Sequence, residues 1–269
     1  MIRGFNRECD VKQTTRHQKI IELVKEEGFV STEALVDNFS VSPQTIRRDL
    51  NELAEKNLLR RHHGGASLLE SRVVNDSYMN RKHKTAQEKM NIAHAMAQQI
   101  PDGSSLFIDI GTTAEALASA LLSHANLRVV TNNLNVASIL MHKPDFRVIV
   151  AGGEVRNKDA GIVGEATVDF INQFRMDFGI ITISGLDMDG SLLDFDYQEV
   201  RVTQAIIECS RQIFLPVDHT KFGRNAMVNI GNVSQVHKIF TDVELPEALS
   251  QLLQQHQIEA IVCQVENYI

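Results

Sequence analysis

The sequence has no long apolar run, few cysteines and no recognisable export signal. None of its hydrophobic segments approaches the length of a transmembrane helix, and the N-terminus lacks the apolar core of a signal peptide. Cys9, Cys209 and Cys263 are far apart and have no metal-ligand spacing, which is typical of reduced thiols. These absences exclude membrane and disulfide-stabilised classes, and they predict a soluble cytoplasmic protein.

Charge is divided unevenly along the 269 residues. The formal net charge is −7, which taken alone argues against a nucleic-acid partner. Residues 1–84 hold 15 Lys and Arg against 12 Asp and Glu, a net charge of +3, whereas the remainder holds 12 against 22, a net charge of −10. With 43% hydrophobic residues, the chain is long enough for two domains, of which the N-terminal one carries the basic excess.

Residues 30–66 predict a winged helix-turn-helix. Two short helices surround a tight turn, and a basic hairpin with a Gly-Gly tip follows. Ser31 is suited to cap the first helix, while Ser42 followed by Pro43 is a typical start for the second, which is expected to end near Lys56. In this class of domain the second helix enters the major groove of DNA.

The two faces of that second helix differ in chemistry. At about 100° per residue, Ile46, Leu50 and Leu53 share one stripe, which we expect to be buried. The opposite face carries glutamine, arginine and asparagine, which read base edges. A solvated amphipathic helix is the alternative, but it does not explain the basic hairpin that follows. The expected DNA-binding residues are Ser42, Gln44, Thr45, Arg47, Arg48, Asn51, Arg60, Arg61, His62 and His63.

The rest of the chain predicts an α/β domain with a mainly parallel sheet. Short apolar strands alternate with helical segments from residue 86 onward. We expect a disordered lead over 1–13, the winged helix-turn-helix over 14–68 with a first helix from Thr14 or Thr15, a linker over 69–85, and a ligand-sensing and oligomerisation domain over 86–269. The expected strands are 105–110, 128–131, 146–151, 178–184, 212–217, 238–241 and 259–263.

Small, hydroxyl and amide residues recur where these strands end. They form the segments 109–113, 131–133 and 152–154, and Lys221 follows a later strand as a possible counter-charge. Each segment alone is explained as a helix cap or a turn. Because ligands of parallel α/β folds bind at the carboxyl ends of strands, their recurrence predicts a polyhydroxylated anionic ligand. The acidic stretch 187–201 lacks the full spacing of a calcium loop, so we expect neither a metal nor a cofactor.

Several segments together resemble those of one known family. They are SVSPQTIRRDLNEL, RRHHGGA, DIGTT, TNN, AGGEVR, DFGI, SGLD and DHTKFG. The family that they resemble is the DeoR family of bacterial repressors. The resemblance runs from about Lys12 to Cys263, and residues 1–11 lie outside it, so Val11 is an alternative start. FDYQEVR and KFGRNAMVN are similar to members that control glycerol catabolism. The resemblance implies a sensor domain similar to ribose-5-phosphate isomerase and an oligomer that leaves double-stranded operator DNA when sn-glycerol 3-phosphate binds as inducer.

The resemblance also implies which residues bind the inducer. The implied ligand-binding residues are Asp109, Gly111, Thr112, Thr113, Asn132, Gly153, Arg156 and Lys221. Asp109 is expected to orient its loop or to bind hydroxyl groups. This chain has Thr203 and Gln204 where family members often carry a basic pair, which puts the choice of ligand in doubt.

Two alternatives remain open. The first keeps DNA binding but changes the inducer to another phosphorylated sugar. The second is a sugar-phosphate isomerase with a DNA-binding appendage, in which Asp187, Asp189 and Glu199 are acid and base candidates. Enediol chemistry usually employs a basic partner, but no lysine lies between Gln173 and Lys221. We therefore expect a regulator and not an enzyme.

Overall fold

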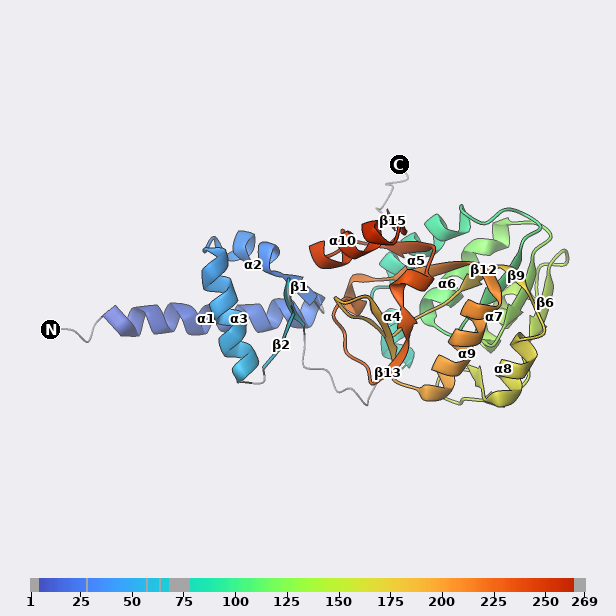
Figure 1. Cartoon of the computed structure of the whole chain (residues 1–269), viewed down its shortest axis with the longest axis horizontal. Helices are drawn as coiled ribbons and strands as arrows, with labels where there is room; N and C mark the ends of the chain where they lie inside the picture. The colour runs from blue at the N-terminus through green and yellow to red at the C-terminus, as the bar shows by residue number, and fades with distance from the viewer. Residues whose placement is uncertain (1–4, 28, 57, 63, 68–77, 264–269) are drawn as a thin grey trace.

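The computed structural model describes residues 5–27, 29–56, 58–62, 64–67 and 78–263. A small N-terminal domain of helices and a three-stranded sheet lies beside a larger α/β domain (Figure 1). Helix α1 projects away from the larger domain, while the three-stranded sheet faces it. None of the helices in the described part of the chain combines the length and apolar composition needed to cross a membrane.

The N-terminal domain is a winged helix-turn-helix with a longer first helix than expected. Its helices are α1 (Phe5–Glu27), α2 (Thr32–Phe39) and α3 (Pro43–Glu55); its strands are β1 (Phe29–Ser31), β2 (Arg60–His62) and β3 (Gly65–Ser67), paired antiparallel in the order β1-β3-β2. The expected disordered lead is wrong for residues 5–13, because α1 already begins at Phe5. Residues 1–4 lie outside the described residues.

Both expected helix caps are present. The Ser31 hydroxyl accepts a hydrogen bond from the N–H of Ala34 at 3.0 Å, and Ser42 accepts one from Thr45 at 3.2 Å. Ser40 between the helices adopts a left-handed conformation with φ 50°, which makes the tight turn. The predicted stripe of α3 packs into the domain core. The buried core residues are Ile20, Val24, Val30, Leu35, Ile46, Leu50, Leu53, Leu59 and Ala66.

A buried carboxylate joins α1 to α3. Asp49 is only 1% exposed and accepts hydrogen bonds from Arg16 at 2.5 and 3.0 Å; His17 contacts it at 3.0 Å. Burial raises the pKa of Asp49, but hydrogen bonds and charge from Arg16 and His17 outweigh that effect and leave the pKa below its ordinary value. Helix α3 is therefore fixed by a charged contact in addition to its apolar stripe.

The larger domain is built on a seven-stranded parallel sheet. Its order is β15-β14-β12-β9-β4-β5-β6, and every neighbouring pair is parallel. The strands are β4 (Ser105–Ile108), β5 (Arg128–Thr131), β6 (Arg147–Val150), β9 (Met176–Ile180), β12 (Ser210–Val217), β14 (Lys238–Thr241) and β15 (Glu259–Val262). Each predicted strand is present, with its ends shifted by at most four residues.

Helices cover both faces of this sheet. Apolar residues of α5 (Ala86–Ala97), α6 (Thr112–Ala120) and α7 (Leu134–Leu140) form one core with Phe178, Phe214 and Phe240 of the strands. Residues of α8 (Glu165–Ile171), α9 (Tyr197–Glu208) and α10 (Glu247–Gln255) form a second core with the alternate strand positions Ile213, Leu215 and Ile239. The sheet is thus buried on both faces, as parallel sheets generally are.

Short strands and turns lie in the connections between the main strands. Strand β7 (Glu154–Val155) pairs with β8 (Ile162–Val163), and β11 (Ser191–Asp194) pairs with both β10 (Gly185–Leu186) and β13 (Val228–Asn232). The 3-10 turns are η1 (Leu121–Ser123), η2 (His219–Lys221) and η3 (Val233–Gln235).

Part of the expected linker is an ordered helix. Helix α4 (Tyr78–His83) packs on α6, because the Tyr78 hydroxyl donates to Glu115 at 2.9 Å and Lys82 lies 3.8 Å from the same carboxylate. The expectation of a linker over 69–85 is therefore corrected for residues 78–85, which belong to the larger domain. Residues 68–77 lie outside the described residues.

Asp49→Asn is expected to destabilise the N-terminal domain by about 2–3 kcal/mol, because it leaves the Arg16 charge without its buried partner. The folded-state pKa is lowered, so this stability is present above an unfolded aspartate pKa of about 3.9 and is lost as the pH falls through the folded value. Thermal unfolding between pH 3 and 7 measures it. The exposed Asp37→Asn serves as control, and equal stability of the two variants would contradict this role.

Candidate DNA interface and anion-binding cavity

The polar face of α3 is accessible. Gln44, Arg47, Arg48 and Asn51 are exposed, while Thr45 is half-buried. The side chain of Arg48 is 79% exposed and forms an ion pair with Glu52 at 3.1 Å one turn along the helix. Such a pair on the surface stabilises little and is easily exchanged for a DNA contact. The predicted base-reading face thus points outward, beginning at the Ser42 cap.

The wing is connected to α3 and to the larger domain. Arg61 is exposed on β2 and donates a hydrogen bond to Asn51 of α3. His62 points the other way: its side chain is 5% exposed, contacts Ser67 at 2.8 Å, and lies 3.8 Å from the Asp187 carboxylate of the larger domain. His62 is therefore corrected from a DNA contact to an interdomain contact. Arg60 is half-buried, and His63 lies outside the described residues.

Burial lowers the pKa of His62 despite the nearby Asp187 charge. A second interdomain contact lies beside it, where the buried Ser67 hydroxyl donates to the Gly223 carbonyl at 3.2 Å. Arg47 also lines a hollow between the domains, together with Glu33, Glu247 and Gln251. The N-terminal domain thus contacts the larger domain through its wing, and Arg47 of α3 borders a hollow between the two domains.

The strand order of the sheet reverses between β4 and β9. The chain leaves β4 through α6 toward β5, on one side, and leaves β9 toward β12, on the other. Neighbouring connections diverge at such a switch point and leave a crevice where ligands of α/β folds bind. The Gly111 loop lies here with φ +153°, and a Cβ atom would meet the Thr182 hydroxyl at 2.8 Å. The sequence needs glycine at this close approach.

The crevice is a cavity with a strongly cationic lining, which we call the anion cavity. Its wall includes the uncapped first turn of α6, whose N–H groups carry the positive end of the helix dipole. Among the described residues that line the anion cavity, Asp218 is the one acidic residue. The full lining is Arg81, Lys84, Thr85, Lys89, Gly111, Thr112, Thr113, Thr182, Ile183, Pro216, Asp218, Thr220, Lys221 and Arg224.

Lys221 and Asp218 are positioned by one short 3-10 turn. The Asp218 carboxylate caps it by accepting the N–H of Thr220 at 3.1 Å. Burial lowers the pKa of Lys221 to about 8, with Arg224, Lys89 and Arg81 adding repulsion against the attraction of Asp218. Burial would raise the pKa of Asp218, but Lys221, Thr220 and Lys89 reverse the shift. The cavity concentrates more positive charge than it neutralises, which suits an anion.

Four of the expected ligand residues meet in this cavity: Gly111, Thr112, Thr113 and Lys221. Asp109 lies beneath the loop and does not line it. The Asp109 carboxylate accepts from the Ile110 N–H at 2.8 Å and from Thr203 at 2.7 Å. Burial raises the pKa of Asp109 to about 6, although these hydrogen bonds act in the opposite direction. Asp109 therefore orients its loop. Thr203, which stands where family members often carry a basic residue, supports Asp109 through its hydrogen bond.

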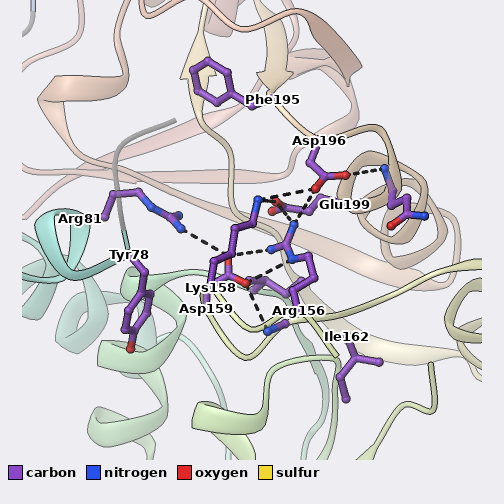
Figure 2. A network of polar contacts seen from close by, with 12 residues as sticks. Tyr78, Arg81, Arg156, Lys158, Asp159, Ile162, Phe195, Asp196 and Glu199 are labelled. Carbon is purple, nitrogen blue, oxygen red and sulfur yellow. Dashed lines mark hydrogen bonds and ion pairs between the residues drawn. The ribbon is translucent and has the colours of Figure 1, made fainter. Parts of the chain in front are cut away.

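Three expected ligand residues lie elsewhere. Asn132 is buried, hydrogen-bonds to Asp109, and donates to the Ile162 carbonyl at 3.2 Å. A Cβ atom at Gly153 would lie 2.1 Å from the Thr167 hydroxyl, so that glycine permits close packing against α8. Arg156 contacts three carboxylates (Figure 2). The expectation that these three residues line the anion site is corrected.

The Arg156 guanidinium finds all of its partners within the protein. Arg156 lies 2.7 Å from Asp159 and 3.0 Å from Asp196, and it also pairs with Glu199. Burial and the neighbouring Asp194 charge raise the pKa of Glu199 to about 7, against the attraction of Arg156. Figure 2 shows that these side chains converge on the guanidinium. Because its bonding capacity is used internally, Arg156 is a structural cation.

Four cations of the lining were not among the expected ligand residues: Arg81, Lys84, Lys89 and Arg224. The dense basic run 81–84 was a usable signal, but it lay in the presumed linker. Lys89 is buried and donates to the Lys84 carbonyl at 2.7 Å. Arg224 is 7% exposed, its guanidinium lies 5.2 Å from the Phe195 ring, and it donates to the Ser184 carbonyl at 3.4 Å. Among the described residues, no group of three or more His, Cys, Asp or Glu side chains is placed to hold a metal ion.

Comparison with known proteins decides the family. The DeoR C terminal sensor domain matches residues 84–243, and the DeoR-like helix-turn-helix domain matches residues 16–72. The chain belongs to the DeoR family. It is 63% identical over 253 residues to the glycerol-3-phosphate regulon repressor of Escherichia coli (strain K12), covering 94% of this chain and 100% of that protein. The Haemophilus influenzae repressor of the same name is 54% identical, with coverage of 94% and 98%.

This DeoR-family chain is accordingly a DNA-binding transcriptional repressor, and the expected class of regulator rather than enzyme is confirmed. The expected winged helix-turn-helix with a parallel α/β domain is confirmed as well. Solved structures with some likeness include ribose 5-phosphate isomerase A from Neisseria gonorrhoeae, at 12% identity and a TM-score of 0.38 over 50% of this chain and 52% of that chain. The fold of the sensor domain is therefore described from its own strand order and not from this likeness.

Affinity of the cavity for a phosphate ester is expected to fall above about pH 8. Lys221 is protonated below its pKa and neutral above it, so the dissociation constant rises by up to about tenfold per pH unit there. A phosphate ester keeps its second charge only above about pH 6, which sets the acid limit. Calorimetric titration with sn-glycerol 3-phosphate from pH 5.5 to 9.5 measures both limits.

The matched variant is Lys221→Arg, because a guanidinium keeps its charge throughout this range. The fall in affinity above about pH 8 is expected to disappear in that variant. A wild-type affinity that stays constant between pH 7.5 and 9.5 would show that Lys221 does not face the anion.

Proposed function

We propose that this DeoR-family protein represses genes of glycerol and glycerol 3-phosphate catabolism and leaves its operator when sn-glycerol 3-phosphate binds the anion cavity. The observation that carries the proposal is the cationic cavity at the switch point, formed by the α6 first turn, Lys221 and Arg224. The identity of 63% to a glycerol-3-phosphate regulon repressor supports the choice of regulon and inducer.

The cavity chemistry supports a small phosphate ester as inducer. Uncapped helix N–H groups, threonine hydroxyls and several cations are suited to a phosphate dianion. Thr112, Thr113 and Thr182 supply hydroxyl groups for the remainder of the ligand. Another phosphorylated sugar is the competing inducer, because the cations recognise the phosphate that both ligands share.

On DNA, an oligomer of this chain is expected to place two or more α3 helices in successive major grooves of repeated or palindromic half-sites, within the cytoplasm. Gln44, Thr45 and Arg48 at the outward face of α3 are the candidates for base contact. Arg47, Arg60 and Arg61 are the candidates for phosphate contact, which makes binding salt-dependent. The α3 face and the wing strand support this assignment.

Release of DNA requires that the inducer favour one arrangement of the two domains over another, since equal affinity for both shifts nothing. The wing contact at Gly223 supplies one path, because Gly223 lies between Lys221 and Arg224 of the cavity. Movement of this segment around a bound phosphate changes the seat of β3 and therefore the position of the wing.

Arg48→Ala is expected to reduce the preference for operator over random DNA, at a cost of about 1–3 kcal/mol for a lost base contact. Fluorescence anisotropy with a duplex selected by the protein from a random-sequence library, and with unselected duplex, measures the ratio. Lys56→Ala, an exposed cation at the far end of α3, is the control. Unchanged discrimination by Arg48→Ala would remove Arg48 from base recognition.

Selective binding of sn-glycerol 3-phosphate over glycerol and fructose 6-phosphate is expected in calorimetry, with release of the selected duplex on addition. Lys221→Ala should bind the duplex normally but resist release, since its cavity lacks a central cation. Lys158→Ala removes a cation that is 57% exposed and outside the cavity lining, so it should be released like the wild type. Preferred binding of fructose 6-phosphate would reject the proposed regulon and keep the repressor.

A further inference from the structure

Helix α4 connects the DNA-binding domain to the anion cavity. It follows the segment 68–77 that continues from β3 of the wing, and it rests on the first turns of α6. The Thr112 hydroxyl donates to the Arg81 carbonyl at 3.4 Å, and the Lys89 ammonium donates to the same carbonyl. Both partners line the cavity. The backbone of α4 is thus held by the residues that would hold an anion.

Arg81 is a lining residue of the cavity, and its side chain is incompletely bonded. Its Nη2 atom lies 3.4 Å from an Asp159 oxygen, and its Nε atom is buried with no hydrogen-bond partner among the described residues. A buried N–H donor without a partner is costly, and a guanidinium is well suited to a phosphate. Figure 2 shows Arg81 reaching toward Asp159 from the opposite side to Arg156.

Asp159 does not depend on Arg81. Arg156 contacts its two oxygens at 2.7 and 3.2 Å, and the N–H of Gly161 approaches one of them at 3.4 Å. The Arg81 contact is longer than either Arg156 contact with Asp159, and a dianion above the α6 first turn offers Arg81 a stronger partner.

We propose that Arg81 is a direct ligand of the inducer's phosphate group and that it transmits inducer binding to the DNA-binding domain by moving α4. The phosphate replaces Asp159 as the partner of the guanidinium and fills the unused Nε–H. Helix α4 is then drawn toward the α6 first turn, and Tyr78, where the connection from the wing enters the helix, moves with it. This inference rests on the proposed function, because it requires that the cavity take a phosphate.

The first test is anion affinity. Calorimetry with sn-glycerol 3-phosphate and with inorganic phosphate compares the full-length wild type with Arg81→Gln. The variant should bind both anions about tenfold more weakly or worse. Lys158→Gln, a cation of the neighbouring network outside the cavity lining, should bind as the wild type does. Wild-type affinity of Arg81→Gln for both anions would overturn the proposal.

The second test separates binding from transmission. The measured quantity is the ratio of the dissociation constants for the selected duplex with and without saturating sn-glycerol 3-phosphate, or saturating inorganic phosphate. Arg81→Gln should bring this ratio close to one. Thr113→Ala alters the cavity but not α4, so it should weaken the anion and keep the wild-type ratio at saturation. A wild-type ratio in Arg81→Gln would overturn the transmitting role.

The reverse change is predicted for Asp159→Asn, which removes the competing carboxylate. Arg156 keeps Asp196 and Glu199 as partners, so the network persists, and phosphate affinity should rise about threefold or more. If Arg81→Gln fails to fold, Asp159→Asn and Arg81→Lys carry the test: unchanged affinity in both overturns the proposal.

Failure of the proposed function is distinguishable from failure of this inference. A wild type that binds inorganic phosphate but not sn-glycerol 3-phosphate would reject the inducer, and Arg81 would still be tested with phosphate. A wild type that binds neither anion would overturn both proposals.

Discussion

The divergence of two neighbouring parallel strands determines the architecture of the sensor domain. Strand β4 continues into α6 on one face of the sheet, while β9 continues toward the β10–β11 hairpin and α9 on the other. Between them the Gly111 backbone passes within reach of Thr182, where only glycine fits. This divergence aims a helix N-terminus into a crevice, and it lets η2 place Lys221 beside it.

Two buried groups of charged side chains lie near each other, but they differ in the ratio of cations to carboxylates. Around Arg156, one carboxylate of the loop after β7 and two at the start of α9 satisfy one guanidinium, so the network holds β7, the following loop and α9 together. Around Lys221, cations from α4, α5 and the segment after β12 gather with Asp218 as the acidic residue in the described lining. Buried charges without partners are costly, so the second group is stable only at the expense of lowered lysine pKa values or with an anion present.

The sequence predicts the main strands well because each is a short apolar run between polar turns. The hairpins β7–β8 and β10–β11 were missed, since two to four residues of mixed polarity carry no period. Helix α4 was missed because Tyr78 and Lys82 anchor it through a distant residue, Glu115. Gly111 and Lys221 were found from their places after strands. Arg156 was misassigned, because no local pattern reveals that Asp196 and Glu199 surround it.

The segment 218–224 faces two ways. Lys221 and Arg224 line the cavity, while the intervening Gly223 carbonyl accepts the Ser67 hydroxyl of the wing. Neighbouring codons of the gene therefore encode groups that face either the cavity or the DNA-binding domain. We therefore expect alleles of neighbouring codons in this stretch to differ in phenotype, according to whether the altered group faces the cavity or the wing.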